Sequence, residues 1–355
     1  MKKLKDTINA IGKPDGAIYD RALARLADQA RPAGSLGVLE SVSARLAGIC
    51  GGLDVRLDRK VIVTCAGDHG VVAEGVSLFP AEVTPQMVAN FVNGGASINI
   101  LGKHAGARVF AADLGVNFDF DPALPIFHKK VGMGTENIAC GPAMSREAAL
   151  RAVTAGIEIV EELAAQEGGL HILGTGDMGI GNTTPSTAVI AAFSGIPVAK
   201  LTGRGTGLDD AALANKIDVI QRALAVNAPD PADPLGVLAK VGGFEIGGLA
   251  GLVLGAAAHG IPVVCDGLIS TAGALIACEL APAAKAYLFA SHRSVEVGHR
   301  FMHERLGLTP LVDFGFRLGE GTGAAITIQL LEAATRILAD IKTFEEVAIG
   351  NAQLS

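Results

Sequence analysis

A continuous apolar run at residues 60–65 (KVIVTC) limits this chain to few folds. It is rich in β-branched residues, which favour strands. It does not alternate between apolar and polar positions, which is typical of a parallel strand buried on both faces. The run ends in residues 66–70 (AGDHG), a polar, glycine-containing end. The run therefore predicts an inner strand of a parallel sheet.

The same pattern recurs along the chain. Further apolar segments with polar or glycine ends occupy residues 108–115, 171–177, 261–267, 284–292 and 311–316. Helical patterns lie between them, including one that begins after Ser145, a residue suited to an N-cap. Alternating strands and helices predict an α/β fold, a parallel sheet flanked by helices. Residues 1–55 and 328–355 contain no strand pattern, so we expect them to pack as a small helical domain beside a large domain of residues 56–327.

Polar side chains recur where the expected strands end. They are Asp68, Asp113, Asp177, Asp266, His292 and Glu320. Because the carboxyl ends of parallel strands meet at one edge, these groups should converge there, and such an edge is where open α/β sheets bind ligands. We therefore expect the active site at this edge.

Glu320 lies between Gly319 and Gly321, after the apolar segment 311–316 and before a helical pattern at 326–334. Glycines allow positive φ angles and close approach of a ligand. A carboxylate here would stand at the sheet edge. The alternative is an ordinary helix entry, in which the helix dipole favours an acid.

Two glycine-rich loops favour binding of a phosphate. Residues 174–179 match G-x-G-x-x-G, but the loop continues to Pro185, and residues 196–200 contain no acid for a ribose, so a nicotinamide dinucleotide is not expected. Residues 203–207 form the second loop, with Lys216 on the following helical stretch. Loop N–H groups attract anions. The alternative is a flexible turn with a solvated lysine.

Composition excludes several classes of protein. The net charge is −7 without a basic patch, which argues against nucleic acid. The five cysteines form no C-x-x-C pair, and the apolar stretches are too interrupted for a membrane span, so we expect a cytoplasmic protein. His299 and His303 share a helix face but lack the H-E-x-x-H glutamate, so we expect no metal. No G-x-S-x-G elbow is present.

Taken together, the motifs resemble the nicotinate-nucleotide–dimethylbenzimidazole phosphoribosyltransferase family. The segments that carry the resemblance are residues 31–40 (RPAGSLGVLE), 66–70 (AGDHG), 174–184 (GTGDMGIGNTT), 202–207 (TGRGTG) and 317–323 (RLGEGTG). They span nearly the whole chain.

The resemblance implies transfer of phosphoribosyl from nicotinate mononucleotide to 5,6-dimethylbenzimidazole, for the lower ligand of cobalamin. It implies a Rossmann-like large domain, a homodimer and no cofactor. It assigns Glu320 as the general base, and it places Phe79, Met87 and Leu318 in the base pocket. The nucleotide and its phosphate would be bound by Gly176, Asp177, Gly179, Asn182, Gly203, Gly205, Lys216, Asp266 and Ser294. Asp177 stands where the family usually has Glu.

Two other functions remain open on sequence grounds. One is a nucleotide-binding or regulatory module without catalysis, which would bind a nucleotide but not turn it over. The other is a different glycosyl or phosphoryl transferase that uses the same phosphate loops. The sequence does not select the preferred base among benzimidazoles, purines and phenols.

Overall fold

The computed structural model describes residues 1–348. The strands are β1 (Lys60–Gly67), β2 (Ala107–Gly115), β3 (Phe127–His128), β4 (Ile172–Met178), β5 (Val263–Cys265) and β6 (Leu288–Ala290). The α-helices are α1 (Lys2–Ala10), α2 (Gly16–Asp28), α3 (Val38–Cys50), α4 (Val83–Val92), α5 (Ser97–His104), α6 (Arg146–Ala164), α7 (Thr183–Ser194), α8 (Val198–Leu201), α9 (Asp210–Asn227), α10 (Pro234–Val241), α11 (Phe244–Ala258), α12 (Leu268–Leu280), α13 (Val297–Leu306) and α14 (Thr322–Asp340). Two 3₁₀ helices are η1 (Gly70–Glu74) and η2 (Pro282–Tyr287).

The strands form one parallel six-stranded sheet in the order β3-β2-β1-β4-β5-β6. This confirms the predicted α/β class and its parallel sheet. The chain moves outward in one direction from β1 through β2 to β3, and then in the other from β4 to β6. The order therefore reverses between β1 and β4, and such a switch point opens a crevice at the carboxyl ends of the strands.

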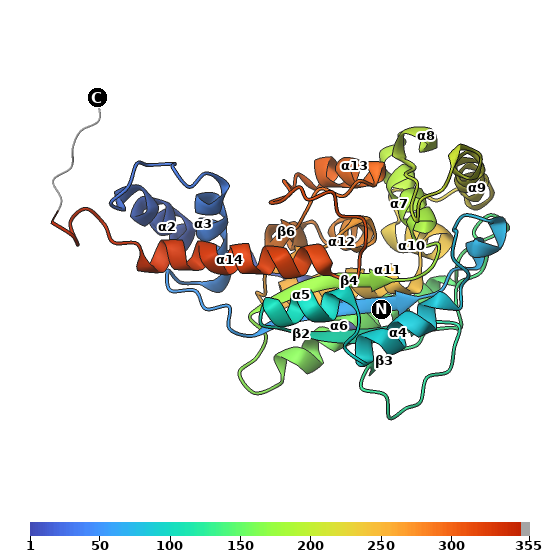
Figure 1. The fold of residues 1–355 in the computed structure, drawn as a ribbon, viewed down its shortest axis with the longest axis horizontal. Coiled ribbons are helices and arrows are strands. Elements are labelled where there is room, and N and C mark those ends of the chain that lie inside the picture. The colour runs from blue at the N-terminus through green and yellow to red at the C-terminus, as the bar shows by residue number, and fades with distance from the viewer. Residues whose placement is uncertain (349–355) are drawn as a thin grey trace.

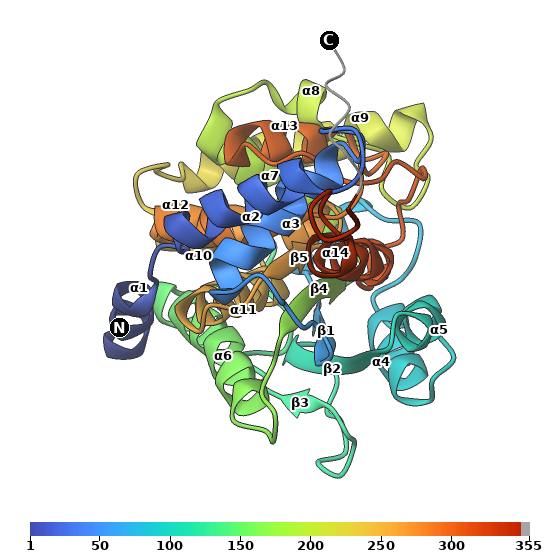
Figure 2. The same ribbon diagram turned by 90° about the vertical axis from the view of Figure 1, so that its left-hand side faces the viewer.

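Helices cover both faces of the sheet (Figures 1 and 2). Side chains of β1 face both layers of helices. Val61 and Val63 pack into a core with α6 and α11, while Ile62 and Ala66 pack into a second core with α14. Every residue of β1 is buried, as the uninterrupted apolar run predicts. Helices α4 and α5 lie on the same side as α14.

Helix α14 extends beyond the sheet and packs there against α3, which packs against α2 (Figure 1). Ser43 of α3 donates a hydrogen bond to the carbonyl of Ala334 over 2.6 Å. Helix α1 instead packs on α6 and α11. The division into a small domain of residues 1–55 and 328–355 and a large domain of 56–327 stays a prediction, and residues 349–355 of it lie outside the described part.

The prediction of a buried strand at residues 311–316 is wrong. This segment forms only an isolated bridge between His292 and Val312, and Asp313 and Phe314 are exposed. It runs past the end of β6 on the molecular surface, where Gly315 turns the chain with a φ of +66°. Conversely, the short edge strand β3 was not predicted.

Within residues 1–348, no helix combines the length and apolar character that a membrane crossing requires.

Candidate active site

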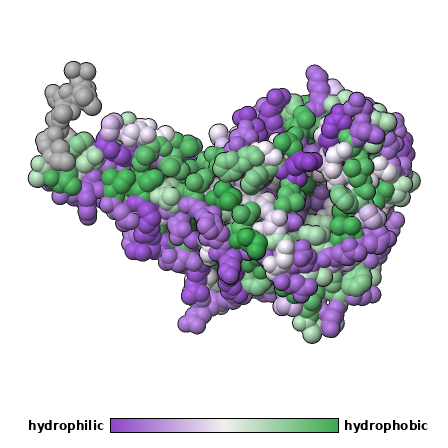
Figure 3. Space-filling model, in the orientation of Figure 1, coloured by the Kyte–Doolittle hydropathy of each residue, from purple (hydrophilic) through white to green (hydrophobic). Residues whose placement is uncertain are grey.

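A cleft of about 720 Å³ opens at the carboxyl edge of the sheet, beyond the ends of β4, β5 and β6. Its wall comes from α4, the loop before α7, the second glycine-rich loop, the segment after β6 and the turn before α14. Figure 3 shows a hollow on the face that carries α4 and α7, bordered by both apolar and polar residues. The cleft therefore lies at the carboxyl edge of the sheet, on the β4–β6 side of the switch point.

The turn before α14 places Glu320 in this cleft with a constrained backbone. Glu320 has a φ of 63°, a left-handed conformation that is unfavourable for a residue with a Cβ. Two contacts hold it: its N–H donates to the carbonyl of Asp177 over 3.1 Å, and its own carbonyl accepts from Thr64 Oγ1 over 2.7 Å. These contacts bind the turn to both β1 and β4.

Gly176 explains how the turn reaches the sheet. A Cβ at this position of β4 would lie 2.3 Å from the carbonyl oxygen of Glu320, so only glycine leaves room for the turn. Gly176 does not line the cleft. In the structure it acts by close packing, and its predicted contact with the nucleotide stays untested.

Asp266, just after β5, anchors the start of α14. Its carboxylate accepts hydrogen bonds from the N–H groups of Gly321, Gly323 and Ala324, over 3.0, 2.7 and 3.2 Å. It thereby occupies the N-terminal donors of α14. Burial raises the pKa of Asp266 to about 7, against the lowering effect of these N–H groups. The geometry gives Asp266 a positioning role for the Glu320 turn.

The Glu320 side chain is nearly buried, at 5% exposure. Its Oε2 accepts a hydrogen bond from the N–H of Ile98, at the start of α5, over 3.1 Å. Oε1 has no partner among the described residues, so it can accept a proton from a ligand. Burial raises the pKa of Glu320, and the Ile98 hydrogen bond opposes this rise. A raised pKa makes a carboxylate a better base near neutral pH.

Asp177, at the end of β4, lies against the same turn. Its Oδ2 accepts from Asn182 Nδ2 over 3.0 Å, while Oδ1 is buried without a partner among the described residues. Burial raises the pKa of Asp177 well above its usual range, and the nearby charge of Asp266 adds to this rise. This carboxyl therefore favours its neutral form and ties the glycine-rich loop to the strand.

The second glycine-rich loop is fixed by Glu296, which sequence reasoning missed. Glu296 Oε1 accepts from the N–H of Gly205 over 2.8 Å. A Cβ at Gly203 would lie 2.2 Å from Glu296 Oε2, so this glycine allows the close contact. The only local feature that could have drawn attention to Glu296 is its position at the N-cap of α13.

Lys216 lies behind this loop as a fully buried cation. Its Nζ donates to Thr183 Oγ1 over 2.6 Å, and Thr183 and Gly205 both line the cleft. Burial lowers the pKa of Lys216 to about 8, and the charge of Glu296 opposes this effect. Lys216 thus places positive charge directly behind the cleft wall.

Most of the predicted site residues meet at the cleft. Those that line it are Phe79, Met87, Asp177, Gly179, Asn182, Gly205, Ser294, Leu318 and Glu320. Those behind the wall are Gly176, Gly203, Lys216 and Asp266. Phe79 and Leu318 are 51% and 56% exposed, so the apolar end of the cleft is open. Among residues 1–348, no three His, Cys, Asp or Glu side chains gather as a metal site would require.

Comparison with known proteins decides the family. A family described as "Phosphoribosyltransferase" matches residues 11–349. A nicotinate-nucleotide–dimethylbenzimidazole phosphoribosyltransferase of Syntrophobacter fumaroxidans is 57% identical over 98% of this chain and 99% of that protein. The chain belongs to this phosphoribosyltransferase family. The protein of the same name from Geobacter sulfurreducens is 54% identical over 99% of each chain.

Solved structures of the family share the fold. The crystal structure of CobT from Thermus thermophilus superimposes with a TM-score of 0.91 at 44% identity, covering 95% of this chain and 100% of that one. Members of the phosphoribosyltransferase family are pentosyltransferases, and the cleft of this chain holds a constrained carboxylate between two glycine-rich loops. The chain is therefore an enzyme rather than a regulatory module.

Proposed function

We propose that this enzyme transfers the phosphoribosyl group of nicotinate mononucleotide to 5,6-dimethylbenzimidazole. The products are α-ribazole 5′-phosphate, which supplies the lower ligand of cobalamin, and nicotinate. The observation that carries the proposal is Glu320, a buried carboxylate in the cleft whose Oε1 is unpaired within residues 1–348. The names and the high identity of the relatives support the choice of substrates.

Glu320 acts as the general base. One nitrogen of the benzimidazole attacks C1′ of the ribose while the C1′–N bond to nicotinate breaks. Positive charge grows on the benzimidazole, and its other nitrogen loses its proton to Glu320 Oε1. The nicotinate leaves with the electron pair of the broken bond, which neutralises its pyridinium charge, so no acid is needed. Attack opposite the leaving group converts the β-linkage to α.

The glycine-rich loops hold the nucleotide. Gly179 and Gly205 line the cleft, and the cation of Lys216 lies directly behind Gly205 and Thr183. A phosphate at this wall would be attracted by the lysine charge and by loop N–H groups. The base would bind at the apolar end, near Phe79, Met87 and Leu318. The homodimer and the cytoplasmic location stay predictions.

The direct test is incubation of the protein with nicotinate mononucleotide and 5,6-dimethylbenzimidazole. We expect chromatography to show nicotinate and α-ribazole 5′-phosphate in equal amounts. Nicotinate without the ribazole would indicate hydrolysis, and neither product would contradict the proposal. Parallel reactions with adenine and p-cresol compare the other acceptor classes. A clear preference for adenine or p-cresol would leave the proposed role of Glu320 as general base unchanged but would change the proposed acceptor.

A further inference from the structure

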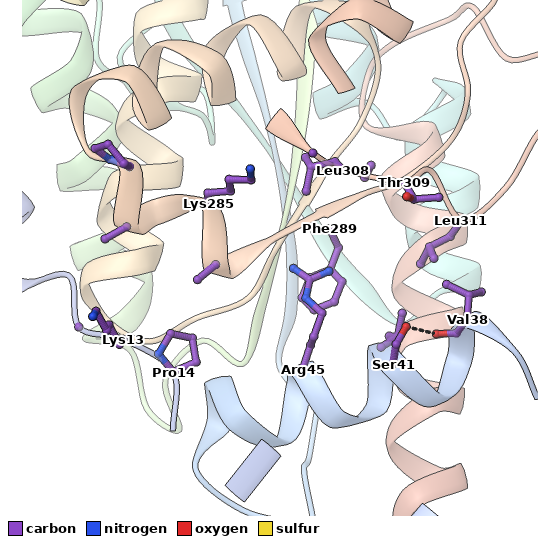
Figure 4. Close-up of a pocket in the computed structure, with 17 residues that line it drawn as sticks. Lys13, Pro14, Val38, Ser41, Arg45, Lys285, Phe289, Leu308, Thr309 and Leu311 are labelled. Atoms are coloured by element: carbon purple, nitrogen blue, oxygen red, sulfur yellow. Dashed lines mark hydrogen bonds between the residues drawn. The ribbon is translucent and has the colours of Figure 1, made fainter. Parts of the chain in front are cut away.

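A second cavity of about 710 Å³ lies on another part of the molecule (Figure 4). It is enclosed by α3, the loop between α1 and α2, η2, β6 and the segment after α13. It shares no lining residue with the catalytic cleft. Its volume is within the range of about 300–1,000 Å³ that is usual for small-molecule sites.

Every charged side chain that lines this cavity is a cation. These residues are Lys13, Arg45 and Lys285, and no Asp or Glu of the described chain lines it. The whole chain has a net charge of −7, so this local positive charge runs against the overall balance. None of the three cations forms an ion pair within residues 1–348.

Arg45 is held in place rather than solvated. Its guanidinium lies 4.2 Å from the centre of the Phe289 ring, and its Nη2 donates to the carbonyl of Leu288 over 2.6 Å. Its Nε and Nη1 have no hydrogen-bond partner in the described part of the chain. Burial lowers the pKa of Arg45, and the neighbouring Tyr19 opposes this effect. A fixed guanidinium with unused donors suits a phosphate or carboxylate.

Lys13 and Lys285 line the same cavity as Arg45 from other segments of the chain. In Figure 4, Lys285 lies on η2 at a level above Arg45, and Lys13 lies on the loop between α1 and α2. Lys285 Nζ lies against Gly307, where a Cβ would come within 3.0 Å of it. The remaining wall is largely apolar, with Val42, Phe289 and Leu311.

We propose that this cavity is a second binding site, which takes a small organic phosphate monoester. Three cations match the charge of a phosphate dianion, and the apolar wall offers contact area to the organic part. This combination favours an ester over inorganic phosphate alone.

The lysines themselves report occupancy. We would measure the rate of reductive methylation of each lysine by mass spectrometry, with glycerol 3-phosphate, inorganic phosphate or glycerol present. We expect glycerol 3-phosphate to slow modification of Lys13 and Lys285 several-fold, and glycerol to have no effect. Lys103 and Lys200, exposed and outside both cavities, should not respond.

Arg45→Met should weaken the protection of both lysines, and Arg21→Met, which removes an exposed arginine from α2, should not. If Arg45→Met does not fold, Lys13→Gln on the exposed loop serves instead, with Lys285 as the reporter. Equal protection by inorganic phosphate would reduce the site to an unspecific anion site and overturn the proposal. So would low reactivity of both lysines in the free protein, which would mean that a second copy covers the cavity.

Discussion

The N–H of Glu320 donates a hydrogen bond to the backbone carbonyl of Asp177 over 3.1 Å. This bond joins Glu320, the proposed general base, to the last part of β4, the strand that also carries the first glycine-rich loop. Glu320 and the first glycine-rich loop are therefore positioned by the same strand, and changes in one should affect the other.

Glu320→Gln tests the central assignment. Glutamine keeps the size and can still accept from Ile98, but it cannot take a proton. We expect normal folding and a loss of kcat of about 10²–10⁴, the usual contribution of a general base. The assay is nicotinate release at saturating substrates, with the melting temperature as the folding check. Glu304→Gln, an exposed change on α13, is the control. Near-native turnover would remove Glu320 from the chemistry.

The pH dependence of kcat gives a second test of Glu320. The base works only when ionised, and its pKa is raised from the ordinary 4.5 by burial. Activity should therefore be present at neutral pH and fall as the pH decreases, with the decline starting above the range of an exposed glutamate. The residual activity of Glu320→Gln should lack this acid limb. Fluorescence at each pH would show that the protein stays folded. An identical acid limb in the variant would assign it to another group.

Lys216 should link nucleotide binding to alkaline pH. Its pKa is lowered to about 8, so the lysine is charged below this pH and loses its charge above it. We expect the KM for nicotinate mononucleotide to rise as the pH passes about 8. Lys216→Met should raise this KM below about pH 8, where the wild-type lysine is charged, approach wild type above it, and remove the dependence. Lys200→Met, an exposed change, should behave as wild type. A wild-type pH curve in Lys216→Met would contradict the role.

Variants of Asp177 separate two roles for its carboxyl group. The raised pKa favours a neutral carboxyl that ties down the loop, and asparagine is a close mimic of that form. We therefore expect Asp177→Asn to keep most of kcat. Asp177→Glu, which adds a methylene to a buried position, should lower the melting temperature. Rates and melting temperatures are measured together. A large loss of kcat in Asp177→Asn with native stability would instead show that the carboxylate orients substrate.

Asp266 should act on catalysis through the position of Glu320. In Asp266→Asn, the amide group faces backbone N–H donors, so at least one buried N–H loses its acceptor, which costs about 1–3 kcal/mol. We expect a lower melting temperature and a lower kcat, with the KM for the nucleotide less affected. The control is Asp313→Asn, which changes an exposed carboxylate in the segment between α13 and α14. A change in KM alone would argue for direct contact with the nucleotide.

Local patterns predicted much of the fold. The run at 60–65 became β1, because β-branched residues without polar alternation require cover on both faces. Residues 311–316 carry a similar apolar composition but lie at the surface beyond β6. Composition alone does not show whether a neighbouring strand is available, and here the only pairing is one bridge. The two-residue strand β3 was too short to produce a pattern.

The candidate site was predictable where it depends on short motifs. Glu320 and both glycine-rich loops were found from adjacent residues. Two groups that hold them, Ile98 and Glu296, were not, because they come from distant segments. Ile98 and Glu320, for example, lie 222 positions apart in the sequence. Gly176 also shows that a local motif does not predict contacts between distant segments. Its position was predicted from a motif, but its packing against the Glu320 carbonyl depends on two segments meeting in the fold.

Helix α14 connects the catalytic turn to the helices farthest from the sheet. Its 19 residues give a length of about 28 Å at 1.5 Å per residue. Its first turn follows Glu320, and its far half is held by α3. Because α14 is long, tilting the whole helix by a few degrees would move the Glu320 carboxylate at its start by on the order of 1 Å. A displacement of α2 and α3 that tilts α14 would therefore move the proposed base.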